Sequence, residues 1–219
     1  MRIGIIGAGH IGGNVARRVA LAGHNVILTF TRDLTKLDAL AAAIGPNASV
    51  GSPGEAGAAE VVVLSVPWGA IDEALAQAGP LAGTIVVDTT NQFGAGGVVD
   101  LGGRTAARYN ADRMPGTRYT KSFNTLTAGF QAAVADRSAD ERVVQWICGD
   151  DSGAKAVVAE LVDEAGYVPV DLGGIDGCAV MEAPRRPGAL YGEEYRASDA
   201  AAVVSAVREG RPIPPTPRY

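Results

Sequence analysis

The hydrophobic pattern of the chain alternates between short apolar runs and longer segments with helical spacing. Residues 61–66, Val-Val-Val-Leu-Ser-Val, form a continuous apolar run, which is typical of a strand that helices cover on both faces. Such runs predict strands over residues 2–6, 25–30, 61–66, 84–88, 118–123, 143–148 and 166–171. The intervening segments predict helices over 11–22, 34–44, 70–78, 103–109, 126–135, 153–165 and 198–208. This alternation predicts an α/β fold of the Rossmann type, a doubly wound, mostly parallel sheet with helices on both faces.

The turn after the first predicted strand reads Gly7-Ala8-Gly9-His10-Ile11-Gly12, which is the G-x-G-x-x-G spacing of dinucleotide-binding folds. Gly7 would permit the tight turn, Gly9 would let the backbone approach a pyrophosphate, and Gly12 would let the helix pack close to the strand. The amides around His10, Ile11 and Gly12 would hold the anion at the positive end of the helix dipole. A structural turn is the alternative in a chain with 29 glycines, but the flanking strand and helix are the required context.

The end of the second predicted strand selects between the two nicotinamide cofactors. An NAD enzyme usually has an acid there, bonded to the ribose 2′-hydroxyl, whereas this strand ends in Thr31 followed by Arg32. A hydroxyl and a guanidinium both donate to a phosphate, so the pair Thr31 and Arg32 favours NADP(H). The alternative is that Asp33 turns back to the ribose while Arg32 is solvated.

Further cofactor contacts are expected where other strands end, because ligands of open α/β sheets lie beyond the carboxyl ends of the strands. The candidates are Val66, Pro67, Trp68, Thr89 and Asn124. Trp68 would either line the cofactor cleft or only cover the helix over 70–78. Thr89 would either bond the nicotinamide ribose or serve as a turn former.

The character of the sequence changes after residue 183. We expect residues 1–183 to form one Rossmann-type domain, with a cofactor-binding half over about 1–125 and a second β/α half over about 126–183. Residues 184–219 form an extension rich in proline and arginine, with an extended ending that either frays or crosses to a neighbouring subunit. Pro169 indicates that the last strand lies at a sheet edge.

Composition narrows the class of protein. A chain of 219 residues with a formal charge of −5 has room for one good-sized core and shows no basic patch for nucleic acid. It has no apolar run of membrane-spanning length, and Met1 leads directly into the first strand without space for a signal peptide, so we expect a cytoplasmic protein. In that compartment Cys148 and Cys178 are expected to be reduced, buried thiols, neither a disulfide nor a metal site.

Few side chains are candidates for catalysis or metal binding. The only histidines, His10 and His24, have no Ser or Cys partner at a plausible site, and no spacing resembles a zinc or iron site. Asp150 and Asp151 precede the helix over 153–165 and are expected to cap it, with a metal or acid/base site as the alternative. Lys121 is the one candidate for a catalytic lysine, against the alternative of a solvated strand residue.

Residues 1–182 together resemble the deazaflavin (coenzyme factor-420)-dependent NADP oxidoreductase family. The likeness lies in Thr31-Arg32, in the strand that ends at Pro67-Trp68, in Cys148-Gly149-Asp150-Asp151-Ser152, and in Asp171-Leu172-Gly173-Gly174 with Glu182. The resemblance implies hydride transfer between NADP(H) and factor-420, with Thr31 and Arg32 at the 2′-phosphate. Asn124 stands where archaeal members have a histidine, and the tail after Glu182 is not the family's apolar helix.

The expected function is therefore hydride transfer between NADP(H) and a deazaflavin or a flavin-like acceptor. The two cofactors carry the reactive carbons, and the protein needs only to orient them and to exclude water. The alternatives are an NADP-dependent dehydrogenase or reductase of a small carbonyl or imine, and a non-catalytic NADP-binding protein. We further expect a homodimer that binds small molecules but neither nucleic acid nor membranes.

Overall fold

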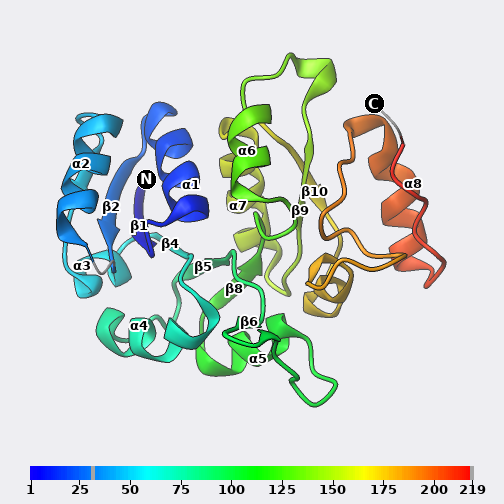
Figure 1. Ribbon diagram of the computed structural model, residues 1–219, viewed down its shortest axis with the longest axis horizontal. Coiled ribbons are helices and arrows are strands. Elements are labelled where there is room, and N and C mark those ends of the chain that lie inside the picture. The colour runs from blue at the N-terminus through cyan, green and yellow to red at the C-terminus, as the bar shows by residue number, and fades with distance from the viewer. Residues whose placement is uncertain (31–32, 218–219) are drawn as a thin grey trace.

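A six-stranded parallel sheet forms the centre of the protein in the computed structural model, which describes residues 1–30 and 33–217. Its strand order is β3-β2-β1-β4-β5-β8, so the direction of winding reverses between β1 and β4, where a Rossmann fold binds its ligand (Figure 1). The strands are β1 (Arg2–Ile6), β2 (Asn25–Thr29), β3 (Ala48–Val50), β4 (Val61–Leu64), β5 (Ile85–Asp88) and β8 (Arg118–Lys121). The predicted α/β class with a doubly wound parallel sheet is confirmed, and of the six strands in this sheet the short edge strand β3 was not predicted.

Helices cover both faces of this sheet. One face carries α1 (His10–Leu21), α2 (Leu34–Ile44), α6 (Ala128–Val134) and α7 (Ser152–Glu164). The other carries α3 (Pro53–Gly57), η1 (Trp68–Ala70), α4 (Ile71–Ala78) and α5 (Ala106–Arg113). Alternation along β1 supplies both cores, because Ile5 packs with Val15 and Val19 of α1 while Ile6 packs with Ile71 of α4. Each burial removes apolar surface from water, and together the two clusters hold the helices on the sheet.

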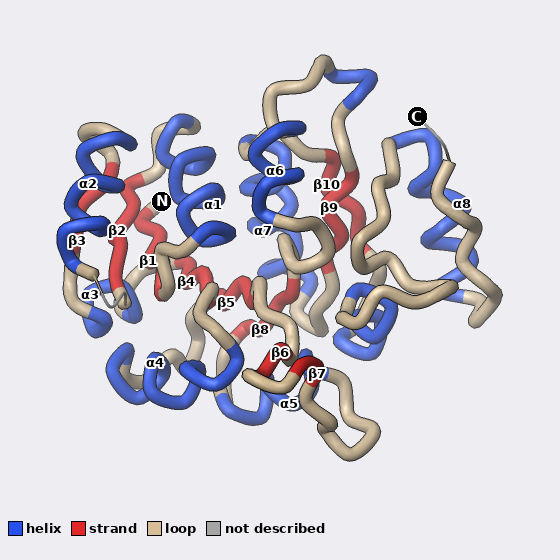
Figure 2. Tube along the Cα trace, viewed as in Figure 1, coloured by secondary structure: helices blue, strands red, loops and turns tan. Residues whose placement is uncertain are grey.

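A second parallel pair, β9 (Val144–Ile147) and β10 (Val168–Asp171), lies beyond β8 (Figure 2). An antiparallel bridge between Lys121 and Cys148 connects it to β8. Within the described ranges β10 pairs with β9 alone, which confirms the edge position that Pro169 indicated. The short elements β6 (Phe93–Gly94), β7 (Gly97–Val98), η2 (Ala139–Glu141) and η3 (Ile175–Met181) fill the connections.

The extension after residue 183 folds back over the second strand pair. Tyr195 O accepts a hydrogen bond from Val144 N at 2.8 Å, and the Tyr195 ring packs edge-on against Trp146. Helix α8 (Ala197–Arg208) then buries Val203, and Tyr195 Oη donates to Pro214 O at 2.8 Å. The described part of the tail, which ends at residue 217, is therefore attached to its own chain through Tyr195, Val203 and Pro214.

Cys148 and Cys178 form a disulfide, so the expectation of reduced thiols is wrong. Their Cα atoms lie 5.8 Å apart although 30 residues separate them in sequence. The bridge joins the residue after β9 to η3, and both cysteines are fully buried. Only the tertiary fold brings these two positions together, so their spacing in the sequence did not reveal the pair.

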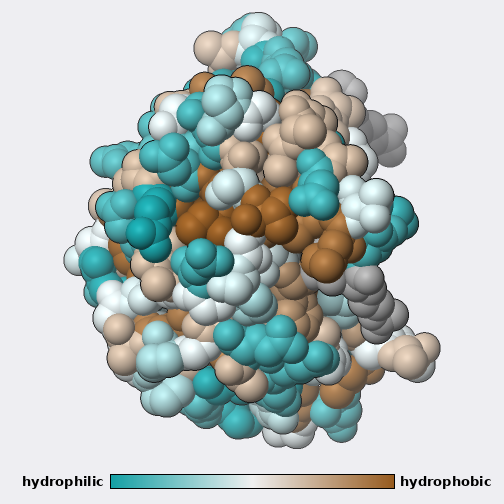
Figure 3. Space-filling model, turned by 90° about the vertical axis from the view of Figure 1, so that its left-hand side faces the viewer, coloured by the Kyte–Doolittle hydropathy of each residue, from teal (hydrophilic) through white to brown (hydrophobic). Residues whose placement is uncertain are grey.

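Part of the surface is apolar. Figure 3 views the molecule from the side of α2 and α3 and shows a brown hydrophobic band between teal hydrophilic patches. Leu37 is the buried residue of α2, whereas Leu34 of α2 and Val50 of β3 are 67% and 39% exposed.

Across the described ranges, no helix has both the length and the apolarity needed to cross a bilayer.

Candidate functional site

The turn between β1 and α1 has the geometry that its glycines predict. Gly7 has φ +99°, and a Cβ there would lie 2.5 Å from Ser65 O, so a side chain is excluded by conformation and by space. A Cβ on Gly12 would lie 2.2 Å from Gly7 O, which shows how closely α1 packs on the turn. A Cβ on Gly9 would meet no described atom within 4 Å. The backbone is thus tightly packed at Gly7 and Gly12 and open to a ligand at Gly9.

Helix α1 begins at this open position. Gly9 is its N-cap and has no side chain with which to cap, and the first turn contains no acidic residue. The amides of His10, Ile11 and Gly12 belong to the first turn, where a helix offers its own N–H groups no acceptor. Ala8 and Ile11 are half-buried, while Gly9 and His10 are exposed. This end of α1 therefore presents amide donors and the positive pole of the dipole to solvent.

The predicted 2′-phosphate residues Thr31 and Arg32 lie outside the described residues. The competing candidate, Asp33, is the N-cap of α2, and its Oδ1 accepts from Lys36 N at 3.2 Å. Asp33 thus has a structural role in starting α2.

The loop after β4 lies beside the glycine turn. Val66 is buried, and its Cγ1 would be 2.7 Å from a Cβ on Gly7. Pro67 is exposed, whereas Trp68 is 7% exposed and packs beneath α5. The Trp68 ring lies 5.7 Å from the Tyr109 ring and 4.9 Å from the Arg113 guanidinium. The side chain of Trp68 therefore anchors the loop to α5, while Val66 and Pro67 remain next to the turn.

The carboxyl end of β5 is bonded to its neighbours on both sides. Thr89 Oγ1 donates to Ser65 Oγ at 3.0 Å or to Leu64 O at 3.2 Å, which connects β5 to β4. Asn91 Nδ2 donates to Asn124 O at 2.9 Å, which connects β5 to the segment after β8. Thr89 and Asn124, both predicted from the sequence, are thus brought to the same edge of the sheet.

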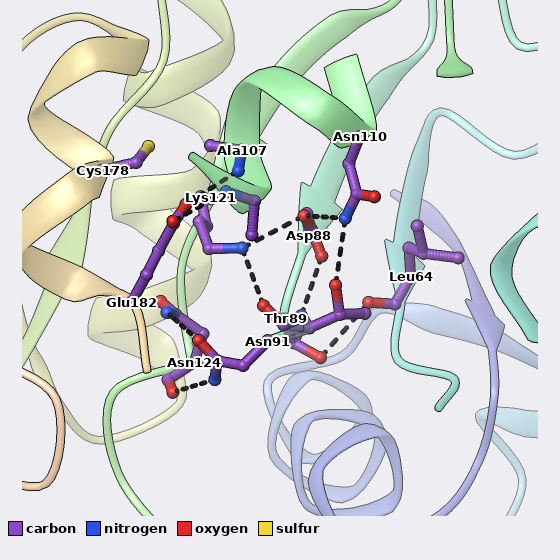
Figure 4. A network of polar contacts seen from close by, with 12 residues as sticks. Leu64, Asp88, Thr89, Asn91, Ala107, Asn110, Lys121, Asn124, Cys178 and Glu182 are labelled. Atoms are coloured by element: carbon purple, nitrogen blue, oxygen red, sulfur yellow. Dashed lines mark hydrogen bonds and ion pairs between the residues drawn. The ribbon is translucent and has the colours of Figure 1, made fainter. Parts of the chain in front are cut away.

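Asn124 is 3% exposed, and its side chain is only partly satisfied. Its Nδ2 donates to Met181 O at 2.8 Å. It also donates to Asn91 Oδ1 at 3.2 Å (Figure 4). Its Oδ1 is buried and has no hydrogen-bond partner among the described residues. A buried acceptor without a donor is costly, and Ser122 Oγ and Thr125 Oγ1 of the same segment also lack a partner among the described residues.

Lys121 is fully buried, so its interpretation as a solvated strand residue is wrong. Its Nζ lies 3.2 Å from Asp88 Oδ2 and donates to Thr90 O at 2.7 Å (Figure 4). Burial alone would raise the pKa of Asp88, but the Lys121 ammonium and the surrounding hydrogen-bond donors outweigh burial and hold this pKa below its usual value. The donors are Asn110 Nδ2, Tyr119 Oη and Thr90 N.

Glu182 is a site-supporting residue whose function the sequence did not indicate. Its two carboxylate oxygens accept from Ala106 N at 2.8 Å and Ala107 N at 2.7 Å, at the start of α5. The carboxylate therefore caps a helix from a segment far along the chain. Helix α5 begins at Ala106 and not at the predicted residue 103, and its N-cap is Thr105, whose Oγ1 accepts from Arg108 N at 3.1 Å.

Asp151 caps α7, as predicted. Its Oδ1 accepts from Ala154 N at 2.8 Å, and both carboxylate oxygens pair with Arg118. The hydrogen bonds from Arg118 and Ala154 N hold the pKa of Asp151 well below its usual value. Asp150 Oδ1 accepts from Ile175 N at 2.8 Å. In the part of the chain that the structure describes, no group of His, Cys, Asp and Glu side chains forms a metal site.

Two aromatic rings, those of Phe93 and Tyr191, pack against each other, and each belongs to a segment that adjoins Asn91 or Asn124. Phe93 follows Asn91 by two residues and is 45% exposed. Its ring lies 6.1 Å from the ring of Tyr191, which the hydrogen bond from Gly192 N to Thr125 O holds beside the segment after β8. The carboxyl edge of the sheet thus combines a polar end at Asn124 with an aromatic pair.

Comparison with known proteins gives matches to oxidoreductases. Residues 2–92 match the family described as "NADP oxidoreductase coenzyme F420-dependent". A hypothetical protein from Sinorhizobium meliloti is 31% identical, with a TM-score of 0.80 over 90% of this chain and 96% of that chain. A proposed F420-dependent NADP reductase from Arthrobacter sp. FB24 is 26% identical, with a TM-score of 0.70 over 82% of this chain and 87% of that chain.

A curated relative matches over a similar part of this chain. The metalloreductase STEAP3 of Rattus norvegicus is 26% identical over 185 residues, which make up 83% of this chain. The chain spans 36% of the length of that relative.

Proposed function

The chain belongs to the coenzyme F420-dependent NADP oxidoreductase family, and on this premise we propose that it transfers a hydride between NADP(H) and a deazaflavin or flavin-like acceptor. The observation that carries the proposal is the open backbone at Gly9, at the start of α1 and at the point where the sheet reverses its winding. Free amides, a helix dipole and space coincide there, which is what a pyrophosphate requires.

The residues present fit NADP(H). Gly7, Ala8, Gly9, His10, Ile11 and Gly12 would hold the pyrophosphate, and Thr31 with Arg32 would bind the 2′-phosphate. Val66, Pro67, Thr89 and Asn124 would hold the nicotinamide half, with Trp68 fixing their loop. Asn124 Oδ1 supports this assignment, because a carboxamide N–H would supply the donor that this buried oxygen lacks among the described residues.

The chemistry belongs to the bound cofactor, which supplies or accepts the hydride at its nicotinamide ring. The protein contributes position and shielding. The amides of the first α1 turn fix one end of the dinucleotide, and the buried strand ends at Thr89 and Asn124 fix the other. Holding two reactants in contact replaces a bimolecular encounter, and this requires no acidic or basic side chain at the reacting carbon.

Phe93 and Tyr191 support a flat acceptor. Phe93 follows Asn91 by two residues and is 45% exposed. Its ring pairs with that of Tyr191, which precedes Gly192, and Gly192 N donates to the O of Thr125, the residue after Asn124. Rings of this kind favour a conjugated ring system through offset or edge contacts. A small carbonyl reductase would need a proton donor, and Lys121, the candidate lysine, is fully buried in an ion pair. We therefore place the deazaflavin or flavin-like acceptor on the Phe93 side of the nicotinamide.

The test is anaerobic stopped-flow mixing of the enzyme and NADPH with a panel of acceptors. We expect the visible band of the oxidised deazaflavin to bleach in a single turnover, faster than reduction of a free flavin. If the enzyme reduced only a small imine or a ferric chelate, the proposed acceptor would be wrong, while NADP(H) would remain the cofactor. Binding of NADPH without turnover of any acceptor would instead identify a non-catalytic NADP-binding protein.

A further inference from the structure

We propose that Lys121 and Asp88 are positioning residues, whose buried ion pair fixes the backbone of residues 89–91 for the nicotinamide half of the cofactor. The inference rests on the proposed function, since it concerns the same site. Neither residue is near enough to the surface to touch a ligand, because both side chains are 0% exposed. Any effect of this pair on cofactor binding must therefore act through the backbone groups to which the two side chains are hydrogen-bonded.

The pair binds both polar groups of one peptide segment. Lys121 Nζ donates to Thr90 O at 2.7 Å, and Asp88 Oδ1 accepts from Thr90 N at 2.8 Å. Lys121 Nζ and Asp88 Oδ2, 3.2 Å apart, close the arrangement (Figure 4). The Lys121 ammonium thus holds the carbonyl of Thr90, and the Asp88 carboxylate holds its amide.

The segment fixed in this way connects three strand ends. Thr89 on one side of Thr90 donates to Ser65 Oγ after β4, at 3.0 Å. Asn91 on the other side accepts from Asn124 Nδ2 after β8, at 3.2 Å. A shift of Thr90 would therefore move Thr89 and Asn124, the two groups proposed to hold the nicotinamide half.

Stability alone does not account for a charged pair in this position. Moving a charged side chain from water into a protein interior costs on the order of several kcal/mol per ion. Apolar side chains of similar volume often stabilise a folded protein as well as a buried ion pair does, or better. Asn110 Nδ2 and Tyr119 Oη also donate to Asp88 Oδ2, so this buried carboxylate oxygen has three hydrogen-bonding or ionic partners. An apolar pair would fill the space but could not hold both the amide and the carbonyl of Thr90.

The experiment compares NADPH affinity and acceptor turnover in matched variants, at a temperature well below the lowest Tm. Lys121→Met/Asp88→Asn removes both charges without leaving one unpaired, and it removes the donor to Thr90 O. Lys121→Gln/Asp88→Asn is also neutral but keeps an amide donor near Thr90 O. Val203→Ala, at a buried position of α8, is the control for an ordinary loss of buried packing.

We expect the Met variant to raise the Kd for NADPH by about tenfold or more and to lower kcat. The Gln variant should recover most of the affinity, and Val203→Ala should lower Tm while leaving Kd and kcat unchanged. Equal Kd and kcat in the Met variant and the wild type would overturn the inference. So would a Gln variant as impaired as the Met variant, because the donor to Thr90 would then be irrelevant.

A second measurement covers the case in which the Met variant does not fold. Amide hydrogen exchange of the wild type should show slow exchange for residues 89–91 even without cofactor, and in the Gln variant the protection should persist. Rapid exchange of these amides in the wild type would overturn the inference. Failure of the wild type to bind NADPH would instead refute the proposed function, so the two failures are distinguishable.

Discussion

The side-chain amides of Asn91 and Asn124 face each other across the ends of β5 and β8. Asn124 Nδ2 donates to Asn91 Oδ1 at 3.2 Å, and Asn91 Nδ2 donates to Asn124 O at 2.9 Å. The same Asn91 oxygen also accepts from Ala183 N at 3.2 Å. This pair therefore joins the two strand ends to the segment that follows η3, and it leaves Asn124 Oδ1 without a partner among the described residues.

Asn124→Ala should weaken NADPH binding and reduce stability together. The substitution removes the donor to the buried Met181 O and the acceptor proposed for the carboxamide. Loss of a buried hydrogen-bond partner costs about 1–3 kcal/mol, so Tm should fall by several degrees and the Kd for NADPH should rise about tenfold. Thermal unfolding with and without NADPH measures both effects, with the exposed Gln77→Ala as control. An NADPH-induced shift as large in Asn124→Ala as in the wild type would remove Asn124 from the cofactor site.

Arg32→Ala should narrow the preference for NADPH over NADH. If Arg32 pairs with the 2′-phosphate, its loss should raise the Kd for NADPH and leave the Kd for NADH almost unchanged. Lys36→Ala is the matched control, because Lys36 is a nearby cation whose side chain is 84% exposed. Titration of each variant with both nucleotides gives the ratio of the Kd for NADH to the Kd for NADPH. An unchanged ratio in Arg32→Ala would place the phosphate contact at other residues.

The disulfide should be detectable by thiol counting. Alkylation of the unfolded, unreduced protein should label neither Cys148 nor Cys178, and prior reduction should allow both to be labelled. A bridge across 30 residues restricts the unfolded chain, which by the chain-entropy estimate contributes about 3–4 kcal/mol. Reduction should therefore lower Tm, whereas Cys148→Ser/Cys178→Ser should no longer respond to reductant. Labelling of both cysteines before reduction would contradict the bridge.

The buried Asp88 should make stability sensitive to acid. Because its pKa is lower in the folded than in the unfolded protein, its stabilising contribution is complete above the unfolded value of about 3.9 and is lost as pH falls through the folded value. Lys121→Met/Asp88→Asn lacks this carboxylate, so its Tm should fall less steeply below pH 4 than that of the wild type. Parallel pH profiles of Tm would show that Asp88 is not held ionised by Lys121.

The central sheet and the glycine turn could be predicted from local sequence. Continuous apolar runs predicted the bounds of β1 correctly and those of β4 and β5 to within two residues, and Gly7, Gly9 and Gly12 lie as their spacing predicted. Strand β3 was missed because Ala48–Val50 is short and only partly buried, so it lacks the apolar run that reveals a strand. The homodimer and the cytoplasmic location stay predictions.

Features set by tertiary contacts could not be predicted in this way. Lys121 lies in a strand where an exposed side chain is the common outcome, and its burial depends on Asp88, which is 33 residues away. Glu182 caps α5 across 76 residues, and Cys178 reaches Cys148 across 30. In each case the partner is supplied by the fold, so no local pattern indicates it.

The most direct test of the account is the affinity of Gly9→Ala for NADPH. A methyl group at Gly9 meets no described atom within 4 Å, so the fold should tolerate it and Tm should not change. Gly54→Ala, in α3, is equally unobstructed and serves as the control. We predict by calorimetric titration that Gly9→Ala weakens NADPH binding at least about tenfold, or ~1.4 kcal/mol, and that Gly54→Ala binds like the wild type. Equal affinities in both variants would contradict a pyrophosphate at this turn.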